Sequence, residues 1–287
     1  MSSSPQTSLA ANAPTQYVEL NGRRLAYRSI GSGKPLLLCT RFRGTLDTWD
    51  PAFLDELAAQ GLRVITFDYT GLGLSGGTPN YSPMELVRDP IELAAALQLE
   101  APAIGGWSLG GIVAQIALAA APGRFTHAAL MGTTPPGPIV KRAEPLFAQL
   151  ATKPVNDAEE QVALFFEPAS EASRAAAAAT QQRLAWRSAE RSPDVPWEFA
   201  AAALAAGPKE APFPAPQVLE MLKKTRVPVL HIGGDHDIVF PVENWYALNG
   251  QLPTLQLLTY PQAGHGPQHQ YPLAAARYIA AFLATTA

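Results

Sequence analysis

The chain has 287 residues with 21 basic and 24 acidic side chains, so its formal net charge is -3. A hydrophobic fraction of 47% with 16% charged residues indicates a globular protein with a large core and excludes a disordered or fibrous chain. The charge gives no electrostatic basis for binding nucleic acid or an acidic membrane surface, and a single cysteine, Cys39, excludes an intrachain disulfide. We therefore expect a cytoplasmic protein that acts on a small molecule, without nucleic-acid or membrane partners.

The N-terminal half begins with a segment that lacks the basic and apolar parts of a secretory signal, so residues 1–16 are predicted to be a flexible leader. Beyond them, Asn21-Gly22 favours a tight turn between two strands. Apolar periodicity over 51–60 predicts a helix, and short apolar runs are of the kind that a parallel sheet buries on both faces. The strands predicted here are 17–20, 24–29, 35–39, 63–67 and 103–106.

A helix is also predicted to begin after Ser82. Ser82 is the expected cap residue, Pro83 occupies the first turn, and Glu85 is expected to complete a capping box. Asp89-Pro90 interrupts the helical pattern, which predicts a kink or a restart at that point.

Strands and helices alternate along most of the second half as well. This alternation indicates an α/β protein whose sheet is mainly parallel and doubly wound. The predicted elements are a helix at 109–121, strands near 126–131, 227–232 and 255–259, and a closing helix at 273–283.

The alternation stops over residues 135–226, where no convincing strand is present. This stretch carries an alanine-rich helical segment at 170–187 and shorter ones near 140–151 and 157–166. We therefore predict that 135–226 is a helical cap inserted into an α/β core, which is formed by 17–134 and 227–287.

Gly106-Trp107-Ser108-Leu109-Gly110 forms a G-x-S-x-G motif between a predicted strand and a predicted helix. A serine on so sharp a turn sits in strained backbone geometry, which requires small neighbours two positions away. The turn places the hydroxyl at the positive end of the following helix and directs the Leu109 amide at a developing oxyanion. Ser108 is therefore predicted to be a nucleophile, although a glycine-rich turn without function could have the same residue pattern.

A serine nucleophile needs an oriented histidine as its base. His127 and His231 fall within predicted strands and are expected to be core or edge residues. His269 is expected at the surface, whereas His265 lies in a glycine-flanked loop after the last predicted strand. His265 is therefore the predicted base.

The carboxylate that orients this base is expected after an earlier strand at the same sheet edge. Asp235 and Asp237 both follow the strand that ends near residue 232, and the order serine, acid, histidine along the chain fits either. The spacing Gly-x-x-Asp-x-x-x-Pro favours Asp237. Asp235 and Asp237, together with His231 and His236, could also be considered as metal ligands. A metal site needs side chains that converge on one point, whereas side chains at a strand end point apart. We therefore expect neither a metal nor a cofactor.

These three motifs resemble those of the α/β-hydrolase superfamily, from about residue 17 to the C-terminus. The segment Asp68-Tyr69-Thr70-Gly71-Leu72-Gly73-Leu74-Ser75 is similar to the family's Asp-x-x-Gly-x-Gly-x-Ser loop, in which the resemblance implies a structural role for Asp68. The sequence Gly-Trp-Ser-Leu-Gly-Gly around Ser108 is similar to that of some microbial carboxylesterases.

One departure from the family lies in the predicted oxyanion loop, where the usual His-Gly is replaced by Thr40-Arg41. The resemblance implies that the backbone amide of Phe42 is the second oxyanion donor. A backbone donor does not depend on the identity of its side chain, but an arginine in place of glycine restricts the backbone at this position.

Several side chains are possible substrate contacts. Arg41 and Arg43 could meet a substrate carboxylate through forked hydrogen bonds, or they could be surface residues or partners of Asp47 and Asp50. Other possible pocket residues are Trp107, Trp186 and Val239. The cap aromatics Trp186, Trp197, Phe165 and Phe166 are more often packing residues than a binding site, but a cap over an apolar cleft would make some of them pocket walls.

The sequence therefore predicts a serine hydrolase that cleaves an ester, lactone or thioester of a small apolar or carboxylate-bearing substrate through an acyl-enzyme on Ser108. Carbon–carbon bond hydrolysis, lyase and perhydrolase reactions use the same three residues and stay open. A ligand receptor with residual hydrolase activity is the alternative from a different functional class. A monomer and a homodimer are both compatible with the sequence.

Overall fold

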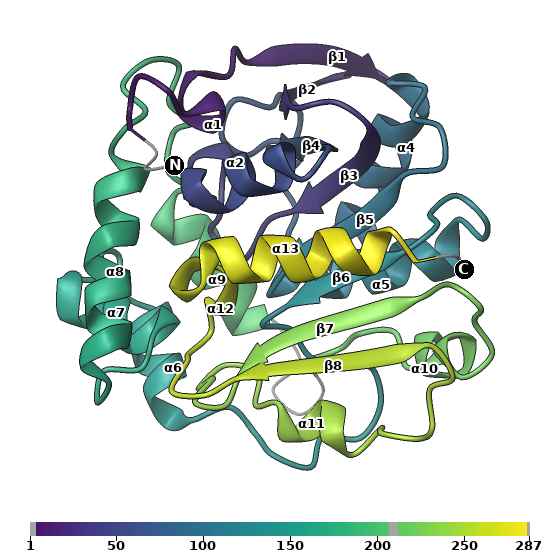
Figure 1. The fold of residues 1–287 in the computed structure, drawn as a ribbon, viewed down its shortest axis with the longest axis vertical. Helices are drawn as coiled ribbons and strands as arrows, with labels where there is room; N and C mark the ends of the chain where they lie inside the picture. The colour runs from purple at the N-terminus through teal and green to yellow at the C-terminus, as the bar shows by residue number, and fades with distance from the viewer. Residues whose placement is uncertain (1–3, 207–211, 286–287) are drawn as a thin grey trace.

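The computed structural model describes residues 4–206 and 212–285. A single eight-stranded sheet runs through this part of the chain in the order β1-β2-β4-β3-β5-β6-β7-β8 (Figure 1). β2 pairs antiparallel with β1 and β4, and the remaining pairs are parallel. The strands are β1 (Gln16–Leu20), β2 (Arg23–Ile30), β3 (Lys34–Cys39), β4 (Leu62–Phe67), β5 (Ala103–Trp107), β6 (Ala128–Met131), β7 (Val229–Gly234) and β8 (Leu255–Tyr260).

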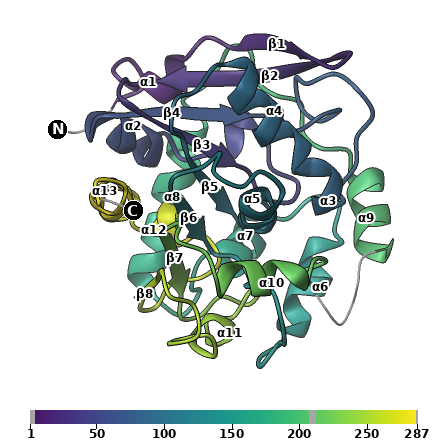
Figure 2. The same ribbon diagram turned by 90° about the vertical axis from the view of Figure 1, so that its right-hand side faces the viewer.

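Helices cover both faces of the sheet (Figure 2). Seen along the sheet edge, α2 and α13 lie on one side, and α4, α5 and α10 lie on the other. The helices of the core are α1 (Leu9–Asn12), α2 (Pro51–Ala59), α3 (Pro83–Leu86), α4 (Arg88–Ala96), α5 (Leu109–Ala120), α11 (Glu243–Tyr246), α12 (Pro267–Gln270) and α13 (Pro272–Leu283), with a 3-10 turn η1 (Leu46–Thr48).

Strand β3 shows how the sequence builds these layers. Leu36, Leu37 and Leu38 are fully buried. Because successive side chains of a strand point to opposite faces, Leu37 packs in the cluster on the α5 side, whereas Leu36 and Leu38 pack in the cluster beneath α2 and α13. A continuous apolar run is therefore what a central parallel strand requires.

The helices predicted between β6 and β7 are present in the structure, and no strand is found among the described residues of 135–226. We call this stretch the helical insertion. It contains α6 (Pro145–Ala151), α7 (Ala158–Phe165), α8 (Glu171–Leu184), α9 (Trp197–Ala206) and α10 (Gln217–Leu222).

The predicted strands and long helices are confirmed, with boundaries that shift by up to about three residues, whereas the helical segment predicted near 140–151 begins only at Pro145. The largest strand shifts are at β6 and β7, which begin at residues 128 and 229 instead of 126 and 227. The restart predicted near Asp89-Pro90 is confirmed, because α3 ends at Leu86 and α4 begins at Arg88.

The capping box predicted at Ser82 is wrong. The Ser82 side chain makes no capping hydrogen bond, and its amide donates instead to Asn80 Oδ1 at 2.7 Å. The Glu85 carboxylate lies 3.9 Å from Arg88 on the exposed helix surface. The helix is only one turn long, so the chain entering it is fixed by a local Asn80 turn.

The flexibility predicted for the leader, residues 1–16, stays a prediction, and its described part, residues 4–16, contains the short helix α1. Ser8 caps α1 by accepting a hydrogen bond from the Ala11 amide. The Ala10 amide donates to Asp55 of α2 at 2.8 Å, and Arg187 of the helical insertion donates to the Ala11 carbonyl. The flexibility was predicted from the small polar residues of this segment. In the structure its backbone groups form hydrogen bonds with α2 and with the helical insertion.

Candidate active site

The loops that follow five neighbouring strands meet at one edge of the sheet. These are the parallel strands β3, β5, β6, β7 and β8, which are neighbours in this order, and β4 lies on the other side of β3. The carboxyl ends of parallel strands lie at the same sheet edge, which is where ligands bind in open α/β sheets. Thr40, Ser108, Thr133, Asp237 and His265 come from the loops after these strands.

Ser108 sits at the turn from β5 into α5, in strained backbone geometry. Its φ and ψ are 58° and -120°, outside the regions that side-chain-bearing residues prefer. A Cβ atom on Gly106 would lie 2.1 Å from the Gly110 carbonyl oxygen, and one on Gly110 would lie 2.0 Å from that of Cys39. The glycines of the motif are therefore required by close backbone contacts, as the sequence predicted.

The structure brings His265 and Asp237 to Ser108. His265 Nε2 lies 2.8 Å from Ser108 Oγ, and His265 Nδ1 lies 2.9 and 3.0 Å from the two Asp237 carboxylate oxygens. All three residues are buried, with exposed fractions of 3–6%. A hydroxyl, an imidazole and a carboxylate in this sequence form a chain that can move a proton from the serine.

The choice between the two neighbouring aspartates is explained by their surroundings. Asp237 Oδ1 accepts hydrogen bonds from the Val239 and Phe240 amides at 2.8 and 2.9 Å. Burial by itself would raise the pKa of Asp237, but the His265 charge and these hydrogen bonds hold it below its usual value. Asp235 is exposed and pairs with its neighbour His236 at 2.6 Å.

The amides of Phe42 and Leu109 are free to donate to a ligand oxygen, since neither has an acceptor within the described part of the chain. Leu109 is the first residue of α5, so its amide has no partner inside the helix. Arg41 does not have a positive φ, which explains how an arginine replaces the usual glycine here. The Arg43 amide donates to Tyr81 Oη at 3.1 Å and thereby fixes the loop.

Arg41 extends across the aromatic side chains beside His265. Its guanidinium carbon lies 4.7 Å from the Phe165 ring centre and 5.3 Å from that of Trp107. Both rings lie 6.2 Å from the His265 ring. Phe240, whose ring lies 5.6 Å from that of His265, was not singled out from the sequence, and Phe165 was weighed mainly as a packing residue, because an aromatic residue in a helix or a loop is usually part of a core.

Trp107 is buried, and its indole NH donates to the His265 carbonyl at 2.7 Å. Its ring lies 4.5 Å from that of His269. His269, predicted at the surface, is buried instead, because α12 packs against α8 and α13 and His269 Nε2 accepts from the Asp50 amide at 3.3 Å. Burial lowers the pKa of His269 to about 4.

The remaining predicted contacts are placed differently. Val239 is buried and meets the site through its amide. Trp186 lies just after α8 and makes no ring contact with the aromatic residues around His265 in the described chain. His231 of β7 and His127, one residue before β6, are both buried, and His231 stacks on Trp245.

Asp47, Asp50 and Asp68 all join the helical insertion to the core. Asp47 pairs with Arg28 of β2 at 2.6 Å and with Arg187 of the insertion at 3.5 Å, and Asp50 pairs with Arg183 of the insertion at 2.6 Å. Arg43 donates to the Lys153 and Pro154 carbonyls, so neither aspartate is its partner. Asp68 accepts from the Leu46 and Leu74 amides and from the Ser192 hydroxyl, which agrees with the bracing role that the resemblance implied.

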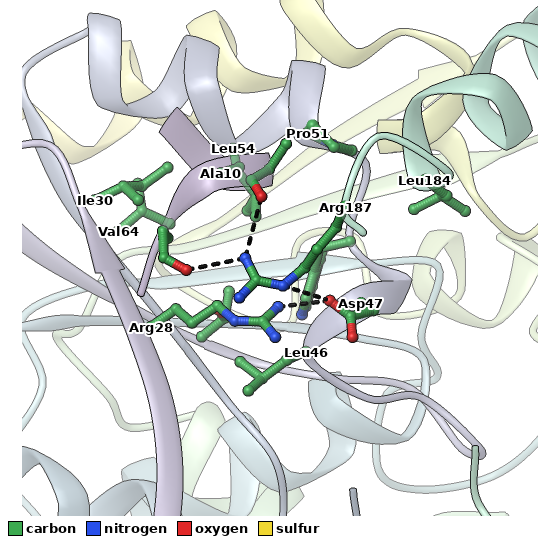
Figure 3. A pocket seen from close by; sticks show the side chains of 14 residues that line it. Ala10, Arg28, Ile30, Leu46, Asp47, Pro51, Leu54, Val64, Leu184 and Arg187 are labelled. Carbon is green, nitrogen blue, oxygen red and sulfur yellow. Dashed lines mark hydrogen bonds and ion pairs between the residues drawn. The ribbon is translucent and has the colours of Figure 1, made fainter. Parts of the chain in front are cut away.

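A small cavity lies away from Ser108, between α1, α2 and the end of α8 (Figure 3). Its volume is about 30 Å³, which is room for a water molecule or two but not for a substrate. Arg28, Asp47 and Arg187 line it and form a buried ion-pair cluster. The cavity is therefore part of the seam between the insertion and the core.

Two further properties concern the described residues. They contain no group of three or more histidine, cysteine or acidic side chains arranged to hold a metal ion. None of their helices is both long and apolar enough to cross a membrane.

The sequence pattern of the alpha/beta hydrolase fold matches residues 34–272. The chain belongs to this family. An alpha/beta hydrolase fold protein from Chitinophaga pinensis is 32% identical, with a TM-score of 0.82, over 96% of this chain and 99% of that one. A Thermogutta terrifontis esterase, solved with malate bound, is 24% identical over 94% and 98% of the two chains, with a TM-score of 0.70, and shows the fold alone.

A Mycobacterium tuberculosis protein named as a non-heme bromoperoxidase, BpoC, is 31% identical over 109 residues. The match covers 38% of this chain and 42% of BpoC, so the chain spans less than half of that relative's length. These comparisons establish an α/β-hydrolase and leave the bond that it cleaves to be argued from the site.

Proposed function

We propose that this α/β-hydrolase is a serine esterase that acts through an acyl-enzyme on Ser108. The observation that carries the proposal is the continuous path from Ser108 Oγ to His265 Nε2 at 2.8 Å and from His265 Nδ1 to Asp237 at 2.9 Å. With Nδ1–H donated to the carboxylate, Nε2 is the nitrogen left to act as a base.

In the first half of the reaction, Ser108 Oγ attacks the ester carbonyl while His265 Nε2 takes its proton. The Phe42 and Leu109 amides hold the resulting oxyanion, and Asp237 stabilises the imidazolium. His265 then gives the proton to the leaving alcohol, and the acyl group stays on Ser108. In the second half, water loses a proton to His265, attacks the acyl-enzyme and releases the carboxylic acid and Ser108.

The test is steady-state and burst kinetics on p-nitrophenyl esters of increasing acyl length. Ser108→Ala is expected to reduce kcat by about 10⁴-fold or more, because both halves of the reaction need the serine. Ser188→Ala, at an exposed position after α8, is the matched control and should keep wild-type kcat. Turnover that survives Ser108→Ala on every ester would contradict the proposal.

Perhydrolysis is a second candidate, favoured by the match to BpoC. Hydrogen peroxide would replace water in the second half, so that the acyl-enzyme gives a peracid and free Ser108. Adding hydrogen peroxide and acetate to the same assays tests this candidate, with peracid measured by its oxidation of bromide. Ser108-dependent ester hydrolysis without peracid would reject the second candidate and leave the first in place.

A further inference from the structure

Arg41 carries a half-buried guanidinium that lacks a carboxylate partner. No acidic side chain of the described residues lies within ion-pair distance of it, although the exposed Asp194 acts on it electrostatically. A poorly solvated cation without a counter-ion is costly. By contrast, four other arginines of low exposure each pair with a carboxylate, namely Arg23, Arg28, Arg183 and Arg187.

The free hydrogen-bond donors of Arg41 lie on one edge of the guanidinium. Nη1 donates to the Phe42 carbonyl at 2.8 Å. Nε is enclosed without a partner, and Nη2 has none in the described chain either but is not fully enclosed. Nε and Nη2 carry two parallel N–H groups that match the two oxygens of a carboxylate.

The same protein contains an occupied example of this geometry. Arg183 Nε and Nη2 donate to the two carboxylate oxygens of Asp50 at 2.8 and 2.6 Å. At Arg41, Nη2 is not fully enclosed, whereas an oxygen on Nε requires the side chains that enclose it to shift.

The position of Arg41 connects it to the reacting groups. Its guanidinium carbon lies 4.7 Å from the Phe165 ring centre, which lies 6.2 Å from that of His265. The guanidinium is therefore no more than about 11 Å from the His265 imidazole, and its own residue precedes the Phe42 amide. Burial lowers the pKa of Arg41 to about 10, so the group remains a cation at neutral pH.

We propose that Arg41 binds a carboxylate of the substrate, so that the preferred substrates are esters that bear a carboxylate group. This inference rests on the proposed esterase function and names its substrate class. The carboxylate supplies the counter-ion that the protein does not provide. A neutral ester of the same length leaves the guanidinium unpaired and is therefore bound less well.

The experiment compares kcat/KM, measured by pH-stat, for ethyl hemi-esters of succinic, glutaric and adipic acids with neutral ethyl esters of equal chain length. A second series, acetyl esters of ω-hydroxy acids, places the carboxylate on the alcohol side. We expect a preference of about 10- to 100-fold for the carboxylate in at least one series, as for hydrogen bonds to charged groups. Arg41→Met should remove the preference, while Arg41→Lys should retain part of it.

Arg43→Met is the matched control, because the Arg43 guanidinium is already occupied by the Lys153 and Pro154 carbonyls. It should keep the wild-type preference. Binding of free glutarate to Ser108→Ala, measured by calorimetry with and without Arg41→Met, gives a readout that does not need turnover.

The outcomes separate the two proposals. Ser108-dependent hydrolysis with equal kcat/KM for charged and neutral esters would overturn the role of Arg41 and leave the esterase function standing. Arg41-dependent glutarate binding without hydrolysis of any ester would reject the esterase function and retain the carboxylate site. A preference that survives Arg41→Met would also overturn the inference.

Discussion

Asp235 and Asp237 are two residues apart and have very different surroundings. Asp237 is buried, contacts His265 and accepts two backbone hydrogen bonds, whereas Asp235 is exposed beside His236. Hydrogen bonds from fixed amides orient the Asp237 carboxylate before any substrate arrives. A group held in this way can fix the tautomer of its histidine.

This difference predicts unequal effects of the same substitution. Asp237→Asn should lower kcat on a p-nitrophenyl ester by about 10³- to 10⁴-fold, because an amide in this position no longer selects the tautomer with a basic Nε2. Asp235→Asn is the matched control and should change kcat by less than about threefold, as exposed ion pairs contribute little. Equal losses in the two variants would refute the assignment of Asp237.

At the scale of elements, the turn from β5 into α5 is fixed by contacts between backbones. A Cβ atom on Gly110 would lie 2.0 Å from the Cys39 carbonyl oxygen of β3. Backbone cannot move aside as a flexible side chain can, so the distance between α5 and β3 sets the residue at this position. The motif is thus a packing requirement as much as a chemical one.

We expect Gly110→Ala to destabilise the protein by about 2 kcal/mol or more, because α5 must shift away from β3 to relieve the clash. Gly76→Ala is the comparison, since its Cβ would meet nothing nearer than 3.7 Å and Gly76 does not have a positive φ. It should change stability by less than about 1 kcal/mol. Chemical denaturation gives both values, and equal stability of the two variants would refute the packing argument.

At the scale of the whole molecule, buried ion pairs join the helical insertion to the core. Asp50 begins α2 by accepting from the Ala52 amide, and it also binds Arg183 and Thr180 of α8. The Asp50 side chain is fully enclosed. Loss of its partner therefore leaves a buried charge without compensation.

Arg183→Met should accordingly destabilise the protein by about 3–5 kcal/mol. Adding Asp50→Asn should restore part of this loss, because the orphaned charge is then removed. Thermal or chemical denaturation of the two single variants and the double variant forms the required cycle. Additive losses would mean that the pair does not couple the insertion to the core.

The sheet and the meeting of Ser108, Asp237 and His265 at its edge could be predicted because their signals are local. Apolar runs such as 35–39, the glycine-flanked Ser108 and the loops of Asp237 and His265 can each be recognised from a few adjacent residues. The burial of His269 and the docking of α1 could not be predicted, since each depends on a partner far along the chain. The Asp50 amide and the Asp55 carboxylate are those partners.

The same limit applies to Arg41. The sequence shows that Arg41 departs from the family pattern. Its stacking on Phe165, however, depends on where α7 ends. Nothing in the residues around Phe165 distinguishes a ring that packs in a helical bundle from one that lies beside an imidazole.

The end of α7 has a consequence for the order of events in turnover. The Phe165 carbonyl accepts a hydrogen bond from the Gly266 amide at 2.7 Å, and a Cβ on Gly264 would collide with the Phe166 backbone at 2.4 Å. The loop that carries His265 and the C-terminus of α7 are thus held together by main-chain contacts. Any motion that lifts α7 to admit a substrate would also draw the imidazole away from the serine. The observed rate would then scale with the fraction of molecules in which α7 is packed against the His265 loop. An enzyme with α7 lifted would be unable to attack an ester.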